Sequence, residues 1–216
     1  MERTGDVSSE SSTVPATLHG RLFLLAFDPS SRRFDGYDPT LFGFALRAAM
    51  LTDLHLRGYL VERAGRAVPA RAAGPDNTLL RAAFAQVGVH NRATWAQLVA
   101  GNAQEAISAV REQLVTEGWL RPRRHPGFAV SADLEPYDES RVGALADETT
   151  GALRTAIAGG SADPWSVAGG LLAALARLPG AVHVQRDRLR VLATGPLVPI
   201  SGLIKAIGDR HAGIRP

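Results

Sequence analysis

The segment Leu41-Phe-Gly-Phe-Ala-Leu-Arg-Ala-Ala-Met-Leu-Thr-Asp-Leu-His-Leu56 carries apolar side chains on almost every face that a helix would present. A helix that is apolar all round is buried in the middle of a core. The segment is followed by Arg57-Gly58, and a basic residue with glycine after it is typical of a helix C-terminus. The sequence therefore predicts a central helix here, with Arg47 as a charged side chain in almost entirely apolar surroundings.

The order helix, glycine, hairpin occurs twice in the sequence. After Gly58, residues 59–69 have the apolar runs and turn residues of a short hairpin. A further helix is predicted from Ala103 to Glu117; it ends at Gly118, and we expect Trp119 to Val130 to form a hairpin that projects into solvent. Two copies are too few for a solenoid.

Helical signals continue along the rest of the chain. Helices are predicted after the caps Asp76 or Asn77, after Thr94, over residues 141–158, from Asp163-Pro164 to Leu178, and over residues 197–207. The runs 22–27 and 181–192 fit either a strand or a helix, and the pattern alone does not decide. We predict a mainly α fold, a single globular helical domain with short β-hairpins over residues 18–216, behind a disordered, polar tail over residues 1–17.

Composition narrows the class of protein. The 216 residues are 45% hydrophobic, which supplies ample material for one core, and they contain no cysteine, so we expect a cytoplasmic location. No apolar run is long enough to span a membrane. The net charge is +3 and the pI about 9.9, with Lys205 as the only lysine. Arginine in place of lysine beside abundant alanine is typical of GC-rich coding and indicates a bacterial source.

The sequence contains none of the familiar catalytic motifs, neither a phosphate-binding P-loop nor GxGxxG, GxSxG or HExxH. The histidines lack the spacing of metal ligands on one element. The carboxylates Asp133, Glu135, Asp138 and Glu139 cluster, but a solvated loop explains them better than a cation site. We therefore expect no enzyme, no cofactor and no metal.

A basic tip within the second predicted hairpin carries more information. Arg121, Arg123 and Arg124 lie beside Phe128 and two prolines. A cation near an anionic membrane contributes about 1 kcal/mol, and burying one aromatic side chain adds about 2 kcal/mol. This combination favours reversible adsorption to an anionic membrane, with an ordinary solvated loop as the alternative.

Three segments carry a family resemblance. Residues 51–60 (LTDLHLRGYL) resemble the LxxELxLRGxL segment of Golgi phosphoprotein 3-like domains. Gly74-Pro-Asp76, with the Leu79-Leu80 pair and Phe84 after it, is similar to the PTGDxLLDxAL segment of that family, and residues 114–120 (LVTEGWL) are similar to its LVExGxL. The resemblance, to a bacterial-type member, implies a mostly helical domain. Eukaryotic members bind phosphatidylinositol 4-phosphate on Golgi membranes, insert a hydrophobic hairpin and retain glycosyltransferases through their cytoplasmic tails.

The resemblance also implies site residues. Arg47 falls on a phosphate-binding arginine of the family, and Tyr37 is placed to substitute for its tryptophan. Two further family arginines fall on Gln104 and Ile107, so that half of the lipid pocket depends on Arg111. We therefore expect a peripheral membrane domain that binds anionic phospholipid head groups, with degraded specificity for phosphatidylinositol 4-phosphate.

Two other functions stay open. A helix followed by a basic hairpin also describes a winged-helix nucleic-acid binder, but Glu105, Glu112 and Glu117 on that helix would repel phosphate. Nucleic acid is therefore a disfavoured partner. A protein-binding adaptor without lipid affinity is the second alternative, and a protein partner at the membrane and self-association are both left undecided by the sequence.

Overall fold

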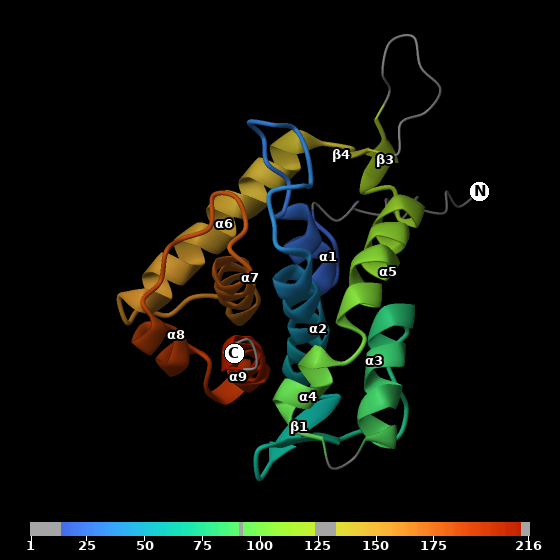
Figure 1. Cartoon of the computed structure of the whole chain (residues 1–216), viewed down its shortest axis with the longest axis vertical. Helices are drawn as coiled ribbons and strands as arrows, with labels where there is room; N and C mark the ends of the chain where they lie inside the picture. Colours follow the sequence, from blue (N-terminus) through green and yellow to red (C-terminus); the bar gives the residue numbers. More distant parts are fainter. Residues whose placement is uncertain (1–13, 91–92, 124–132, 213–216) are drawn as a thin grey trace, which may run out of the picture.

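The computed structural model describes residues 14–90, 93–123 and 133–212. Helices dominate this part of the chain, as predicted, and its strands form two small antiparallel hairpins (Figure 1). The helices are α1 (Leu18–Leu24), α2 (Pro39–Leu56), α3 (Thr78–Val89), α4 (Trp95–Ala100), α5 (Ala103–Thr116), α6 (Glu139–Ile157), α7 (Pro164–Leu175), α8 (Arg186–Leu192) and α9 (Val198–Ala212), with a short 3-10 turn, η1 (Gly195–Leu197). The strands are β1 (Leu60–Arg63), β2 (Arg66–Pro69), β3 (Leu120–Pro122) and β4 (Leu134–Pro136).

Helix α2 is the centre of the fold. It begins at Pro39, where the side chain of Asp38 accepts hydrogen bonds from two backbone N–H groups of the first turn. In Figure 1, α3 and α5 lie on one side of α2, and α6, α7 and α8 lie on the other. Helix α4 packs against both α2 and α9 near the lower end of α2 in this view. Gly43 allows α5 to approach closely, because a Cβ there would lie 2.3 Å from the carbonyl oxygen of Ala103. The all-round apolar pattern of this helix thus corresponds to contacts with neighbours on both sides.

The two predicted helix–glycine–hairpin units close in the same way. Gly58 and Gly118 have φ angles of +70° and +78°, which glycine adopts at low cost. The residue after each glycine donates a backbone hydrogen bond back into its helix, Tyr59 to Leu54 at 2.9 Å and Trp119 to Leu114 at 2.8 Å. This is the Schellman end of a helix, which turns the chain directly into a strand.

The return strand of the second unit differs from the prediction. We expected it at Gly127 to Val130, which lies outside the described residues. The strand that pairs with β3 is β4, so that Arg121 lies opposite Glu135. The strand that pairs with β3 therefore comes later in the chain than the sequence pattern indicated.

The structure also decides the two ambiguous segments. The first, at residues 22–27, belongs largely to helix α1, and the second contains helix α8. Arg188 and Arg190 therefore lie on a helix, where residues two apart do not share the face that they would have shared on a strand. Residues 14–17, which we had assigned to the tail, contact the body of the domain: the backbone oxygens of Pro15 and Ala16 accept hydrogen bonds from Arg21 and Arg57. Among the described residues, no helix is both long and apolar enough to span a bilayer.

Candidate functional site

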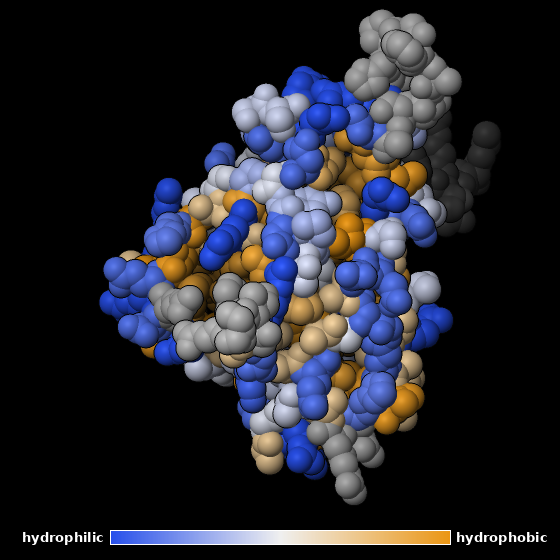
Figure 2. Space-filling model, viewed as in Figure 1, coloured by the Kyte–Doolittle hydropathy of each residue, from blue (hydrophilic) through white to orange (hydrophobic). Residues whose placement is uncertain are grey.

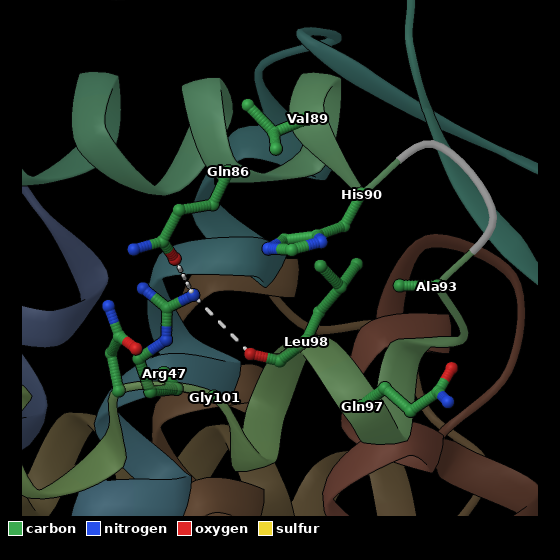
Figure 3. Close-up of a pocket in the computed structure, with 9 residues that line it drawn as sticks. Arg47, Gln86, Val89, His90, Ala93, Gln97, Leu98 and Gly101 are labelled. Carbon is green, nitrogen blue, oxygen red and sulfur yellow. Dashed lines mark hydrogen bonds between the residues drawn. The ribbon is translucent and has the colours of Figure 1, made fainter.

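Arg47 leaves the middle of α2 in the direction of α3 and α4. Its neighbours in the helix, Leu46 and Ala48, are fully buried in the core, and Arg47 itself is only 5% exposed. One terminal nitrogen, Nη2, donates to Gln86 Oε1 at 2.6 Å and to the backbone oxygen of Leu98 at 3.3 Å (Figure 3). The guanidinium is thus held by neutral groups from two neighbouring helices.

No described carboxylate forms an ion pair with Arg47. Burial lowers the pKa of Arg47, and the more distant charge of Glu105 opposes that effect. The Nε atom of Arg47 is buried and has no hydrogen-bond partner in the described structure. Buried charges in proteins are normally paired, because removing an ion from water is costly. Arg47 therefore keeps a hydrogen-bonding capacity that the protein itself does not use.

A cavity of about 600 Å³ opens beside Arg47. Its wall comes from α2, from the C-terminal end of α3, and from α4 and the turn that follows it, and it contains Arg47, Gln86, Val89, His90, Ala93, Gln97, Leu98, Gly101 and Asn102. No carboxylate is among the described residues of this wall. In Figure 3 the ring of His90 and the amide of Gln86 extend over the same space as the guanidinium of Arg47. The cavity therefore presents one full positive charge and several neutral polar groups.

The N-terminus of α5 lies at the edge of this cavity. Asn102 precedes the helix in a left-handed conformation, with φ at +54°, and its side chain does not cap the helix. The first N–H groups of a helix carry a partial positive charge. The helix end therefore adds to the positive potential that Arg47 creates.

Tyr37 and Arg111 line a different cavity, so the structure does not bring the three predicted lipid-binding residues together. This second cavity has a volume of about 180 Å³ and also contains Ile107, Arg33 and Asp133. Burial raises the pKa of the Tyr37 hydroxyl, and nearby Arg111 opposes that shift. Arg33 pairs with Asp133 at 3.2 Å, and also with Asp35 at 3.5 Å. Two arginines and two aspartates thus balance each other here, whereas the Arg47 cavity has no acidic wall residue.

Two of the predicted hairpin cations are partly compensated. Arg121 Nε donates to Glu135 Oε1 at 2.9 Å, and its guanidinium lies 5.5 Å from the ring centre of Tyr137. Arg123 Nε lies 4.0 Å from the other oxygen of Glu135. Arg124 and Phe128 lie outside the described residues. One carboxylate therefore stands beside two of the arginines at the base of the hairpin.

The acidic residues around β4 have separate local roles. Asp138 caps α6 by accepting hydrogen bonds from two backbone N–H groups, and Glu139 pairs with Arg32. Asp133 and Glu135 pair with Arg33 and Arg121 as described above. Within the described part of the chain, no group of three or more histidine or acidic residues could hold a metal ion.

A third cavity, of about 360 Å³, lies between α6, α7 and the turn after α7. Apolar atoms surround a hollow on this side of the molecule in Figure 2. Its polar groups are engaged within the protein: the hydroxyl of Thr149 donates to the Leu145 carbonyl, and Glu139 accepts from Arg32. It presents no cation, so the Arg47 cavity is the better candidate for an anion.

The sequence did not predict the residues that surround Arg47. Its partners Gln86 and Leu98 lie on α3 and α4, and the neighbouring wall residues His90 and Asn102 lie at the ends of α3 and α5. None belongs to a recognisable motif. The available signal was the arginine itself, a charge in an almost wholly apolar helix. Its partners depend on how α3 and α4 pack, which periodicity does not reveal.

The fold and the site define a class of protein: a helical domain whose central helix presents a buried cation to a solvent-open cavity. The model of the family Golgi phosphoprotein 3 (GPP34) matches residues 18–199. The chain belongs to this family, as the sequence resemblance predicted. No curated protein matches the chain.

Proposed function

We propose that this chain is a peripheral membrane-surface domain that recognises anionic phospholipid head groups and has no catalytic role. The observation that carries the proposal is the cavity beside Arg47. It combines a buried cation, an unused N–H donor and an uncapped helix end, and its wall contains no carboxylate. An anion there would supply the pairing that burial of the arginine demands.

The hairpin at the end of α5 supplies the membrane contact in this proposal. The three arginines contribute about 1 kcal/mol each. Because Glu135 lies beside Arg121 and Arg123, the net contribution of the three arginines together falls from about 3 to about 2 kcal/mol. Insertion of Phe128 adds about 2 kcal/mol. Tyr137 is 68% exposed at the base of the hairpin, and tyrosine favours the membrane–water interface.

Recognition of phosphatidylinositol 4-phosphate is expected to be weak. Gln104 is exposed and neutral, and Ile107 is an apolar residue in the wall of the second cavity, where the family resemblance implies arginines. Arg111 and Tyr37 are the remaining candidates for a secondary head-group contact. Each missing charge-assisted hydrogen bond would have contributed about 1.5 to 3 kcal/mol. Selectivity therefore suffers more than adsorption does.

The nucleic-acid alternative is weaker than the membrane proposal. The exposed face of α5 carries Glu105 and Glu112, and Glu117 follows at its end. A recognition helix with this charge would be repelled by phosphate. The adaptor proposal is complementary: a domain held at the cytoplasmic membrane surface also suits a protein partner there.

Vesicle co-sedimentation tests the proposal. The full chain is mixed with neutral, anionic and phosphatidylinositol 4-phosphate vesicles at about 0.15 M salt, where exposed charges are screened beyond about 8 Å. We expect binding to both anionic vesicle types that weakens as salt rises, with little binding to neutral vesicles. Duplex DNA added as a competitor should not displace the protein.

Three variants locate the contact. The triple variant Arg121→Ser, Arg123→Ser and Arg124→Ser should lose vesicle binding and keep its circular dichroism spectrum. Arg47→Gln should lose the head-group contribution, and Arg154→Gln, an exposed arginine on α6, is the matched control. No vesicle binding by the parent protein would reject the proposal and favour the adaptor function.

A further inference from the structure

We infer that the Arg47 cavity selects a monoanionic phosphodiester that carries a polyol, in preference to a phosphomonoester. The inference rests on the proposed function, because it names the class of anion that the same cavity takes. Glycerol and inositol phosphodiesters are the head groups of this class. Three properties of the cavity support it: its charge, the chemistry of its wall and its volume.

The charge of the wall matches a single negative charge. Among the described residues that form the wall, Arg47 is the one arginine or lysine. The α5 terminus adds about half a charge at the edge. Glu105, in the first turn of α5, acts on Arg47 from outside the wall and subtracts from this potential. A phosphodiester has one negative charge, whereas a phosphomonoester has nearly two at neutral pH.

The remaining polar groups are neutral and suit hydroxyl groups. Gln86 uses its carbonyl oxygen for Arg47, which leaves the amide NH₂ as a donor. Gln97 likewise uses its oxygen to cap α4 at Thr94. The side chains of His90 and Asn102 complete this set in the wall. Amide and imidazole groups both donate to and accept from hydroxyls, but they neutralise no charge.

The volume exceeds what a phosphate needs. A water molecule occupies about 30 Å³ in the liquid, and the cavity holds about 600 Å³. The wall between the polar groups consists of Val89, Ala93, Leu98 and Gly101, which leave room for the carbon skeleton of a polyol. The arginine therefore holds the phosphate, and the amides hold the hydroxyls.

The unused atoms of Arg47 show where the phosphate binds. Its Nη2 atom is already occupied by Gln86 and Leu98, and its Nη1 atom has only the sulfur of Met50 at 3.8 Å. Nε has no partner among the described residues. Because Nε is buried, a phosphodiester oxygen reaches it only when the guanidinium turns toward the cavity. Charge-assisted hydrogen bonds then replace the weak contact to Met50.

Soluble head groups test the inference without a membrane. Calorimetric titration of the full chain at pH 7.5 would use three probes: glycerophosphoinositol, a monoanionic diester; inositol 4-phosphate, a monoester; and uncharged inositol. We expect the diester to bind at least about tenfold more tightly than the monoester, and inositol to bind more weakly than both. Arg47→Gln should weaken the diester by about 10- to 100-fold, and Arg154→Gln should leave it unchanged.

A pH series separates charge from shape. The second pKa of a phosphomonoester is about 6, so the monoester becomes a monoanion at pH 5.5. In a His90→Gln background, which removes the imidazole from the described wall of the cavity, monoester binding should strengthen at pH 5.5 while diester binding stays constant. Glu105→Gln, which removes the neighbouring negative charge, should narrow the difference between the two probes at pH 7.5.

A parallel experiment with vesicles distinguishes binding of the membrane lipid from binding of the free head group. Phosphatidylinositol, phosphatidylglycerol and phosphatidic acid vesicles are compared at equal surface charge, and the first two should bind more protein. Equal or tighter binding of the monoester would overturn the inference and leave the membrane proposal standing. Soluble binding of the diester without vesicle binding would reject the membrane proposal and support the inference. Vesicle binding without any soluble binding would overturn the cavity as the head-group site.

Discussion

Two arginines belong to the central helix region: Arg47 lies within α2, and Arg57 caps its C-terminal end. Their surroundings differ in kind. Arg57 donates to the carboxylate of Asp53 one turn earlier and to the backbone oxygen of Ala16, and it lies 4.8 Å from the ring centre of Trp165. Arg47 lies deeper in the core and meets only neutral acceptors. The more exposed arginine has the full set of partners, and the more buried one lacks a carboxylate.

The difference in partners indicates that Arg57, and not Arg47, contributes to the stability of the fold. Asp53 and Arg57 fix the start of α1, because the same carboxylate accepts the backbone N–H of Leu18 at 2.8 Å. In this cluster of Asp53, Arg57 and Leu18, the polar atoms find their hydrogen-bond partners within the protein. Proteins depart from such satisfaction mainly at functional sites. We therefore propose that Arg47 lacks a carboxylate partner because it binds a ligand, and four predictions test the contrast with Arg57.

The largest effect on the unfolding free energy is expected in the cluster of Asp53, Arg57 and Leu18. Asp53→Ala removes a fully buried carboxylate and leaves the N–H of Leu18 and the guanidinium of Arg57 without their acceptor. Breaking a buried pair in this way should cost roughly 3 to 4 kcal/mol of unfolding free energy. Urea denaturation followed by circular dichroism measures it. Asp53→Asn keeps an oxygen for Leu18 and should cost about half as much; a loss below about 1 kcal/mol for the alanine variant would contradict a structural role.

The next effect is a dependence of stability on pH. His19 is fully buried, and desolvation lowers its pKa from 6.5 to about 4, although a hydrogen bond to Gln113 opposes the shift and the charge of Arg57 adds to it. The unfolded chain takes up this proton first, so stability is complete above pH 6.5 and is lost as pH falls toward 4. The loss is at most about 3 kcal/mol. Burial raises the pKa of Asp53, which reduces the loss because protonated Asp53 favours the fold at low pH.

Denaturation midpoints between pH 7 and pH 4.5 measure this slope. His19→Gln should flatten the slope, whatever its effect at pH 7, because glutamine does not titrate. Asp53→Asn should make the slope steeper, since it removes the opposing group. A parent protein whose stability is constant over this range would contradict the buried neutral state of His19.

A smaller effect is expected from changing only the shape of the cation. Arg57→Lys keeps the charge. A lysine ammonium lacks the planar guanidinium that donates at once to the carboxylate of Asp53 and to the backbone oxygen of Ala16. The loss of about one hydrogen bond should cost about 1 kcal/mol. Faster proteolysis at residues 14–17 would accompany it, because that segment loses an anchor. Unchanged stability and unchanged proteolysis would show that the ion pair alone matters.

The two arginines also show which features of the structure could be predicted from the sequence and which could not. The central helix, its glycine end and the caps at Asp163 and Thr94 were predictable, because each is a local rule with a local signal. The separation of Tyr37 and Arg111 from Arg47 was not predictable. It depends on which face of α5 meets α2, and the resemblance alone had grouped these residues. The later return strand was missed because β4 has only three residues and β3 is equally short.

The smallest effect on stability is expected at the proposed site. Arg47→Met removes the charge and keeps an unbranched side chain in the core. The protein loses the hydrogen bonds to Gln86 and Leu98 but no longer desolvates a guanidinium, and water in the cavity can reach the acceptors that are left. Because apolar replacements of buried charges are often neutral or stabilising, the unfolding free energy should stay within about 1 kcal/mol of the parent. Diester binding should fall in the same sample by the factor expected for Arg47→Gln. A cost near that of Asp53→Ala would instead make Arg47 a structural residue, and Arg47 and Arg57 would then differ in their partners but not in their role.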